Sequence, residues 1–195
     1  MPLKRSVRCF KVVIERMLCE MPEHWLASLK PTQRKKAEEM ILQMMAWGAP
    51  NPEEWVQSEI EEEIPQTTRF LVLRTMWANI NSWRDQSSEW TSRITSTADK
   101  NPRGYFADAG AAVKRMQDAG VTLEDLGRVA RFVSYESIFS AINRIDEGGD
   151  PEIDDAPGWA LVEVGPEGDA TGRIVGGLHE DLLMLDPSGR DGAAG

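Results

Sequence analysis

The residues best suited to acid–base chemistry lie together near the end of the chain. His179 is followed directly by Glu180 and Asp181, and all three come after Gly176-Gly177. An imidazole beside carboxylates can act as a general base or supply half of a metal site. The same residues also suit a helix N-terminus, where acidic side chains complement the helix dipole. We favour the structural interpretation and keep catalysis as the alternative.

Motifs that define metal, phosphate or nucleophile chemistry are missing. The chain has two histidines, His24 and His179, and two cysteines, Cys9 and Cys19. Their positions match no zinc site, and no Walker loop, EF-hand or nucleophile elbow occurs. On one helix the two cysteines would lie roughly 15 Å apart, whereas a disulfide needs Cα atoms within about 7 Å. We therefore predict reduced thiols, a cytoplasmic location, no metal and no cofactor.

Negative charge is concentrated at the C-terminal end. The net charge is −10 overall; residues 146–195 alone contribute −11, whereas residues 1–48 carry +4. An acidic surface repels phosphate backbones and attracts basic proteins. The sequence thus predicts a basic protein as partner, not nucleic acid. The candidate contacts are the carboxylates Asp150, Glu152, Asp154 and Asp155.

Two of the seven tryptophans are candidates for contact with a partner. Trp83 and Trp90 are one heptad apart in a segment rich in polar residues, so we expect both to be partly exposed. Exposed aromatic side chains supply much of the binding energy at protein interfaces. Trp47, Trp55 and Trp77 follow helical apolar spacing and are expected mainly in the core.

Apolar residues recur at helical spacing through most of the chain. The pattern predicts helices over residues 3–20, from Pro31 to about residue 47, over 66–96 and over 105–118. Asn51-Pro52-Glu53-Glu54 resembles a capping box and predicts another helix start. Thr122 is expected to cap a last long helix. The buried stripe predicted for that helix is Leu126, Val129, Val133, Ile138, Ile142 and Ile145.

The last fifty residues differ in character from the rest. Residues 148–158 are rich in Gly, Pro and acids, which predicts a linker or exposed loop. Residues 159–164 and 173–175 are expected to form a β-hairpin, followed by a short helix over 178–185. We predict a helical domain over 1–147, a hairpin and helix over 159–187 that pack on it, and a flexible tail over 188–195. The fold class is mainly α, a bundle of five to seven helices with a small C-terminal hairpin.

No apolar stretch approaches the ~20 residues that cross a bilayer, so no membrane is expected among the partners. The N-terminus carries Lys4, Arg5 and Arg8, but Glu15 interrupts its apolar run, and we take it as part of the fold. Contact of the basic residues 1–36 with nucleic acid or a membrane is the least favoured idea.

The preferred function is a protein–protein interaction module. An inhibitor or immunity-type role is one form this would take, with a basic partner expected to bind through the acidic surface. The alternative is an enzyme or small-ligand sensor with a pocket near His179, Glu180 and Asp181. In that alternative Arg173 and Tyr135 are placed nearby by conjecture. The oligomeric state is not predicted.

Overall fold

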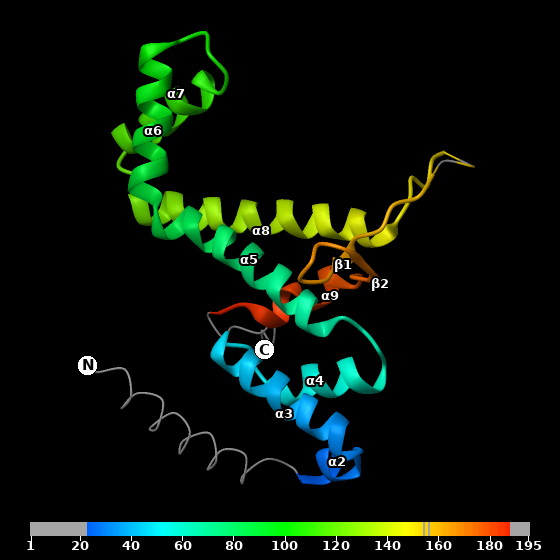
Figure 1. Cartoon of the computed structure of the whole chain (residues 1–195). Helices are drawn as coiled ribbons and strands as arrows, with labels where there is room; N and C mark the ends of the chain where they lie inside the picture. The colour runs from blue at the N-terminus through cyan, green and yellow to red at the C-terminus, as the bar shows by residue number, and fades with distance from the viewer. Residues whose placement is uncertain (1–22, 154, 156, 188–195) are drawn as a thin grey trace, which may run out of the picture. The chain divides into compact units, whose positions relative to one another are not determined.

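The computed structural model describes residues 23–153, 155 and 157–187 (Figure 1). The predicted helix over 3–20, Cys9, Cys19, Asp154, the side chain of His24 and the tail over 188–195 lie outside what is described. The predicted class, mainly α with a C-terminal hairpin, is confirmed. The elements are α2 (Glu23–Ser28), α3 (Pro31–Ala46), α4 (Pro52–Glu61), α5 (Gln66–Asp85), α6 (Ser87–Lys100), α7 (Ala107–Asp118), α8 (Leu123–Glu147), β1 (Val162–Val164), β2 (Ala170–Ile174), α9 (Leu178–Leu182) and the 3-10 helix η1 (Leu183–Leu185).

The chain forms two compact units, Met1–Phe70 and Leu71–Gly195, which are described separately. None of the helices within the described residues combines the length and apolar character needed to cross a bilayer. In the first unit, α3 starts at Pro31 as predicted, because proline suits the first helical turn. It ends at Ala46, with Trp47 as the C-cap, and the following Gly48 has the positive φ of a helix C-terminus. Its inner face buries Ala37, Ile41 and Met44.

Helix α4 starts at Pro52 as expected, but the predicted capping box does not form. Asn51 has a left-handed conformation (φ 45°), and its side chain accepts no hydrogen bond from the helix. Side chains of α4 instead support the start of α5. One Glu59 carboxylate oxygen accepts from the backbone N–H and the hydroxyl of Thr67, at 2.7 and 2.6 Å, and Gln66 donates to Ser58. These bonds satisfy groups that a helix N-terminus leaves free.

The prediction of a single helix over 66–96 is wrong. The chain breaks at Gln86 into α5 and α6. Two contacts lie at the break. The indole N–H of Trp90 donates to the carbonyl of Trp83 at 2.7 Å, and Gly127 of α8 lies against the backbone of Arg84. A Cβ on Gly127 would lie 3.1 Å from that backbone, so a glycine lets the two helices approach closely at this point.

Helices α6 and α7 pack against each other and form what we call the α6–α7 arm (residues 87–118). The close contact is at Gly110, where a Cβ would lie 2.5 Å from the Ile94 carbonyl oxygen and 2.6 Å from the Ala98 Cβ. A glycine is therefore needed for this packing distance. The arm stands at the end of α8 where that helix begins (Figure 1).

Helix α8 begins with the predicted cap, but the set of residues predicted to be buried along it is only partly correct. The Thr122 hydroxyl accepts from the Asp125 N–H at 3.1 Å. Leu126 and Ile142 are buried as expected, but Val129 and Val133 are 63% and 54% exposed. The other side of the helix faces the protein, because α8 packs on α5 and on the C-terminal segment through a row that includes Arg131 and Tyr135. Apolar periodicity alone could not distinguish these two faces.

The C-terminal segment is anchored by residues that follow the hairpin. Strands β1 and β2 pair antiparallel, with Val162 opposite Ile174 and Val164 opposite Ala170. Val175, Leu178 and Leu182 are fully buried, and the Trp77 indole donates to the Leu182 carbonyl at 2.7 Å. The strands themselves bury little.

Candidate functional site

His179 pairs with Asp146, a carboxylate at the end of α8 that the sequence did not single out. The distance from His179 Nδ1 to Asp146 Oδ2 is 2.7 Å, and the same oxygen accepts the backbone N–H of His179 at 3.1 Å. The side chain of Asp146 is 6% exposed and that of His179 is 28% exposed. Asp146 is followed by Glu147-Gly148, so by sequence it belongs to the acidic segment and carries no sign of a special role.

This pair can orient an imidazole. A buried carboxylate bonded to Nδ1 fixes the ring and leaves Nε2 toward the surface, which is the arrangement a general base needs. It also has a structural role, because Asp146 satisfies a free N–H at the start of α9. Asp146 Oδ1 is buried and has no hydrogen-bond partner among the described residues.

The other two predicted catalytic residues do not converge on His179. Glu180 is exposed and Asp181 is half-buried, both on α9. Successive residues of a helix point about 100° apart, so three consecutive side chains cannot meet at one point. Arg173, placed near His179 by conjecture, instead pairs with Glu163 at 3.2 Å.

A row of aromatic rings leads from the core of the second unit to His179. Tyr135 lies between Trp77 and Phe139, with ring centroids 5.9 and 6.2 Å away, and Phe139 meets the imidazole edge-on at 6.0 Å. Burial raises the pKa of Tyr135 above 10.0, and the nearby carboxylates Glu136 and Asp186 raise it further. Tyr135 therefore stays a neutral phenol, able to donate a hydrogen bond, at ordinary pH.

Arg131, on the face of α8 that also carries Tyr135, contacts residues at the end of the described chain. Its guanidinium bonds both oxygens of Asp186, at 3.0 and 3.2 Å, donates to Asn81 at 2.8 Å and lies 5.3 Å from the Trp77 ring centroid. These contacts hold η1 against α5 and α8.

The C-terminal acids fall into two groups. Asp146, Glu147, Glu163 and Asp186 are paired with His179, Arg144, Arg173 and Arg131. Asp150, Glu152 and Asp155 are exposed on the loop over 148–158, which we call the acidic loop. Within the described part of the chain, no ion pair involves these three. The predicted negative surface is therefore smaller than the sequence suggests, but these three carboxylates remain exposed on it.

The hairpin turns its apolar face outward. Val162, Val164 and Ile174 share one face, and both Val164 and Ile174 are 62% exposed. The charged pair Glu163–Arg173 lies on the other face and is half-buried, with side chains 13% and 33% exposed. A hairpin that packs on a protein normally does the reverse. We call these three apolar side chains, with Glu167 and Asp169 of the adjoining turn, the hairpin surface.

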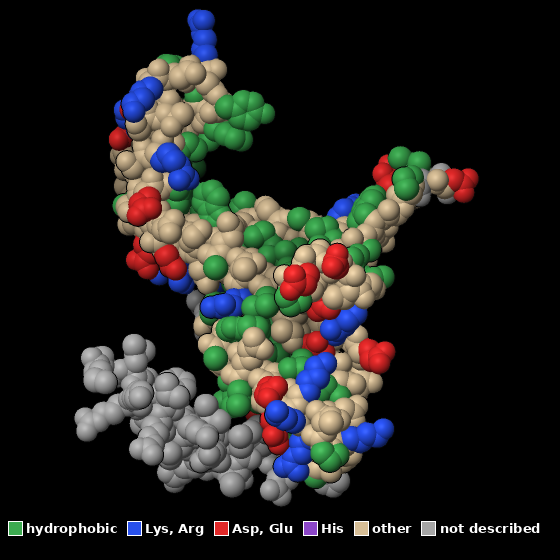
Figure 2. All heavy atoms as spheres, in the orientation of Figure 1, with side chains coloured by type: hydrophobic (Ala, Val, Ile, Leu, Met, Phe, Trp, Pro, Cys, Tyr) green, Lys and Arg blue, Asp and Glu red, His purple; other side chains and the backbone are tan. Residues whose placement is uncertain are grey.

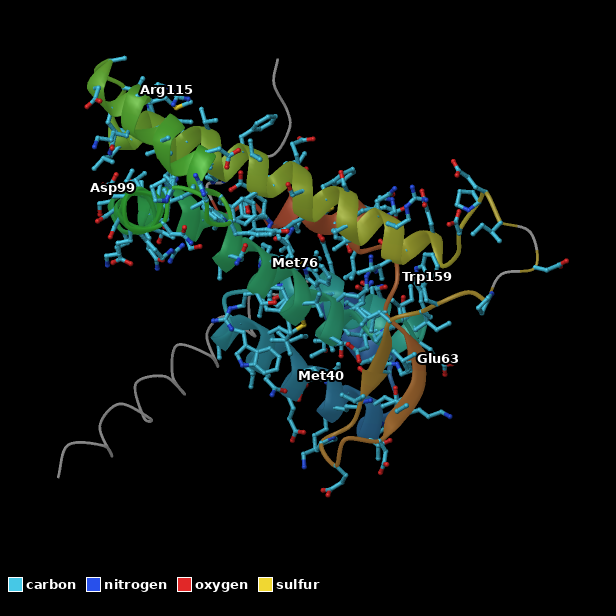
Figure 3. The ribbon with its side chains drawn as sticks, turned by 90° about the horizontal axis from the view of Figure 1, so that it is seen from above. Met40, Glu63, Met76, Asp99, Arg115 and Trp159 are labelled. Atoms are coloured by element: carbon cyan, nitrogen blue, oxygen red, sulfur yellow. The ribbon has the colours of Figure 1, made fainter. Side chains whose placement is uncertain are left out.

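Acidic and apolar side chains lie next to one another over β1 and β2 (Figure 2). Trp159 joins the acidic loop to the hairpin: its indole donates to the Arg144 carbonyl at 3.1 Å, and its N–H donates to the Gly148 carbonyl. The loop and the hairpin are thus attached at the same end of α8, beside the labelled Trp159 (Figure 3).

Trp83 and Trp90 meet edge-on, with ring centroids 5.9 Å apart, at the junction of α5 and α6. They line an open pocket of about 240 Å³, with Asn79, Ser82, Gln86, Glu89 and Arg93. This pocket lies near the first turn of α8, since Gly127 contacts Arg84. The acidic loop follows the last turn, about 30 Å further along the helix at 1.5 Å per residue. The structure therefore does not bring the two predicted sets of contact residues together.

Comparisons of the chain with protein-family models, with curated proteins and with solved structures found no match. Among the described residues, no three His, Cys, Asp or Glu side chains are grouped so that they could hold a metal ion.

Proposed function

We propose that this protein is a protein–protein interaction module that binds a basic partner through the hairpin surface and the acidic loop. The observation that carries the proposal is the reversed hairpin, which exposes Val162, Val164 and Ile174 while the Glu163–Arg173 pair on the other face is half-buried. Exposed apolar groups rimmed by polar residues are typical of interaction sites. An inhibitor or immunity-type role fits such a surface.

The two parts of this surface have different tasks. The apolar side chains supply contact area that is removed from water on binding, at about 25 cal/mol per Å². The carboxylates of Asp150, Glu152 and Asp155 attract a basic partner and raise its association rate, an effect that salt weakens. Val129, Phe132 and Val133 expose a second apolar area on α8, which also favours a binding protein. Trp83 and Trp90 would contact the same partner as the hairpin surface only if that partner extended along α8.

The proposal is tested by neutralising the acidic loop. The variant with Asp150→Asn, Glu152→Gln and Asp155→Asn removes three exposed charges. We expect a basic protein captured from a native lysate by the wild type to associate about tenfold more slowly with this variant at low salt. We expect the difference to shrink as salt is added. Association and dissociation rates measured by surface plasmon resonance at several salt concentrations give both quantities.

The matched control neutralises Glu61, Glu62 and Glu63, three exposed acids at the end of α4. It changes the net charge by the same amount at another place, so it should leave the rates unchanged. Val164→Ser should speed dissociation without altering the salt dependence. Equal slowing in both neutralised variants would show a general charge effect and would remove the acidic loop from the interface.

A second candidate function, catalysis by His179, is favoured by its 2.7 Å contact with Asp146. In this case His179→Ala should reduce turnover of a reactive ester such as p-nitrophenyl acetate by about 10²–10⁴-fold while the fold is kept. Glu180→Gln, which alters the exposed neighbour, should not reduce it. An ester hydrolysis rate that is the same in wild type and His179→Ala would exclude His179 as a base in this reaction.

A further inference from the structure

The Trp83–Trp90 pocket contains a charged pair whose members do not meet. Glu89 and Arg93 lie four residues apart on α6 and both line the pocket. Glutamate four residues before arginine is the favourable order for a helix ion pair. Yet among the described residues neither Glu89 nor Arg93 takes part in an ion pair.

Three other oppositely charged pairs at this spacing in the described helices form ion pairs, whereas Lys114 and Asp118 on α7 do not. Arg34 pairs with Glu38 at 2.9 Å and Lys35 with Glu39 at 3.8 Å, although both have the less favourable order. Arg128 pairs with Glu124, which has the same order as the pair in the pocket. Of the two pairs with the favourable order in the described helices, Glu124–Arg128 forms an ion pair and Glu89–Arg93 does not, so both charges of the second pair can reach a ligand.

We propose that the pocket binds a free α-amino acid with an apolar side chain. An ammonium group beside Glu89 and a carboxylate beside Arg93 would give each side chain a group of opposite charge. A zwitterion carries these two groups a short distance apart. The indoles of Trp83 and Trp90 offer an apolar wall for the side chain. Ser82 and Gln86 add hydrogen-bonding groups at the rim.

The size of the pocket selects a small ligand. Pockets for drug-sized molecules measure about 300–1,000 Å³, whereas this one has about 240 Å³. The pocket is open to solvent, so each charged contact contributes little, and we expect a dissociation constant on the order of millimolar. This site is separate from the hairpin surface and does not depend on the proposed function.

The test follows the indole N–H signals of the seven tryptophans in ¹⁵N–¹H correlation spectra during titration with L-leucine. Trp83→Phe and Trp90→Phe assign the two signals of the pocket. We expect these two to shift and saturate, while the signal of Trp77, buried and bonded to Leu182, stays in place. No saturable shift at concentrations well above millimolar, or equal shifts of all the indoles, would overturn the proposal.

Blocked ligands test the two charges separately. N-acetyl-L-leucine and L-leucine amide, which each lack one charge, should bind about fivefold more weakly. Glu89→Gln should abolish the preference for the free amine, and Arg93→Gln the preference for the free carboxylate. Arg84→Gln, at a neighbouring position outside the pocket lining, should leave both preferences unchanged. Equal binding of the free and blocked forms by the wild type would also overturn the proposal.

Discussion

Ile142→Ala should lower the free energy of unfolding by about 2–5 kcal/mol, whereas Val133→Ala should change it by less than about 0.5 kcal/mol. Both residues belong to the stripe that the sequence predicts as buried. In the structure Ile142 is fully buried and Val133 faces solvent. Truncating Ile142 removes apolar contacts and leaves a cavity. Truncating Val133 removes little contact, and alanine has a higher helix propensity than valine.

Urea unfolding followed by circular dichroism measures both changes. Val129→Ala provides a second exposed position from the same stripe and should behave like Val133→Ala. If Val133→Ala cost as much as Ile142→Ala, the outer face of α8 would be covered in solution, either by part of the chain or by another copy. That result would contradict the expectation that Val133 faces solvent.

The sequence predicted the elements well because their signals are local. Pro31 and Pro52 mark helix starts by their fixed φ, and Thr122 caps α8 with its own hydroxyl. Gln86, where α5 ends and α6 begins, has no such signal. Near the break, Gly127, some forty residues away along the chain, allows α8 to approach the backbone of Arg84, and no local pattern announces such a contact.

The candidate sites were predicted only in part, again because contacts between residues far apart in the chain leave no local signal. His179 was found because imidazoles are rare in this chain, but its partner Asp146 is 33 residues away and resembles the acids around it. The exposed position of Val164 and Ile174 was missed, because alternation in a strand defines two faces without saying which one is buried. Trp83 and Trp90 were expected to be semi-exposed from their polar surroundings, and the structure places them at a pocket.

Arg131→Ala should lower the free energy of unfolding of the second unit by about 2–3 kcal/mol. The side chains of Arg131 and Asp186 are 20% and 10% exposed, so removing the guanidinium leaves a largely buried carboxylate without this counter-charge. Breaking a fully buried pair costs about 3–5 kcal/mol, and partial exposure reduces that figure. The contacts with Asn81 and the Trp77 ring are lost as well.

Arg128→Ala is the matched control for this prediction, because it removes the same side chain from the same helix. Arg128 is mostly exposed, and among the described residues it pairs only with Glu124 and Asp125 of its own helix, so its loss should cost less than about 0.5 kcal/mol. Combining Arg131→Ala with Asp186→Asn should cost about 1 kcal/mol less than the sum of the single changes, since the two side chains interact directly. The comparison also bears on function. If Arg131→Ala and Arg128→Ala were equally mild, η1 would not be held against α8. The end of the C-terminal segment, which follows the hairpin surface, would then lack the support that a preorganised interface requires.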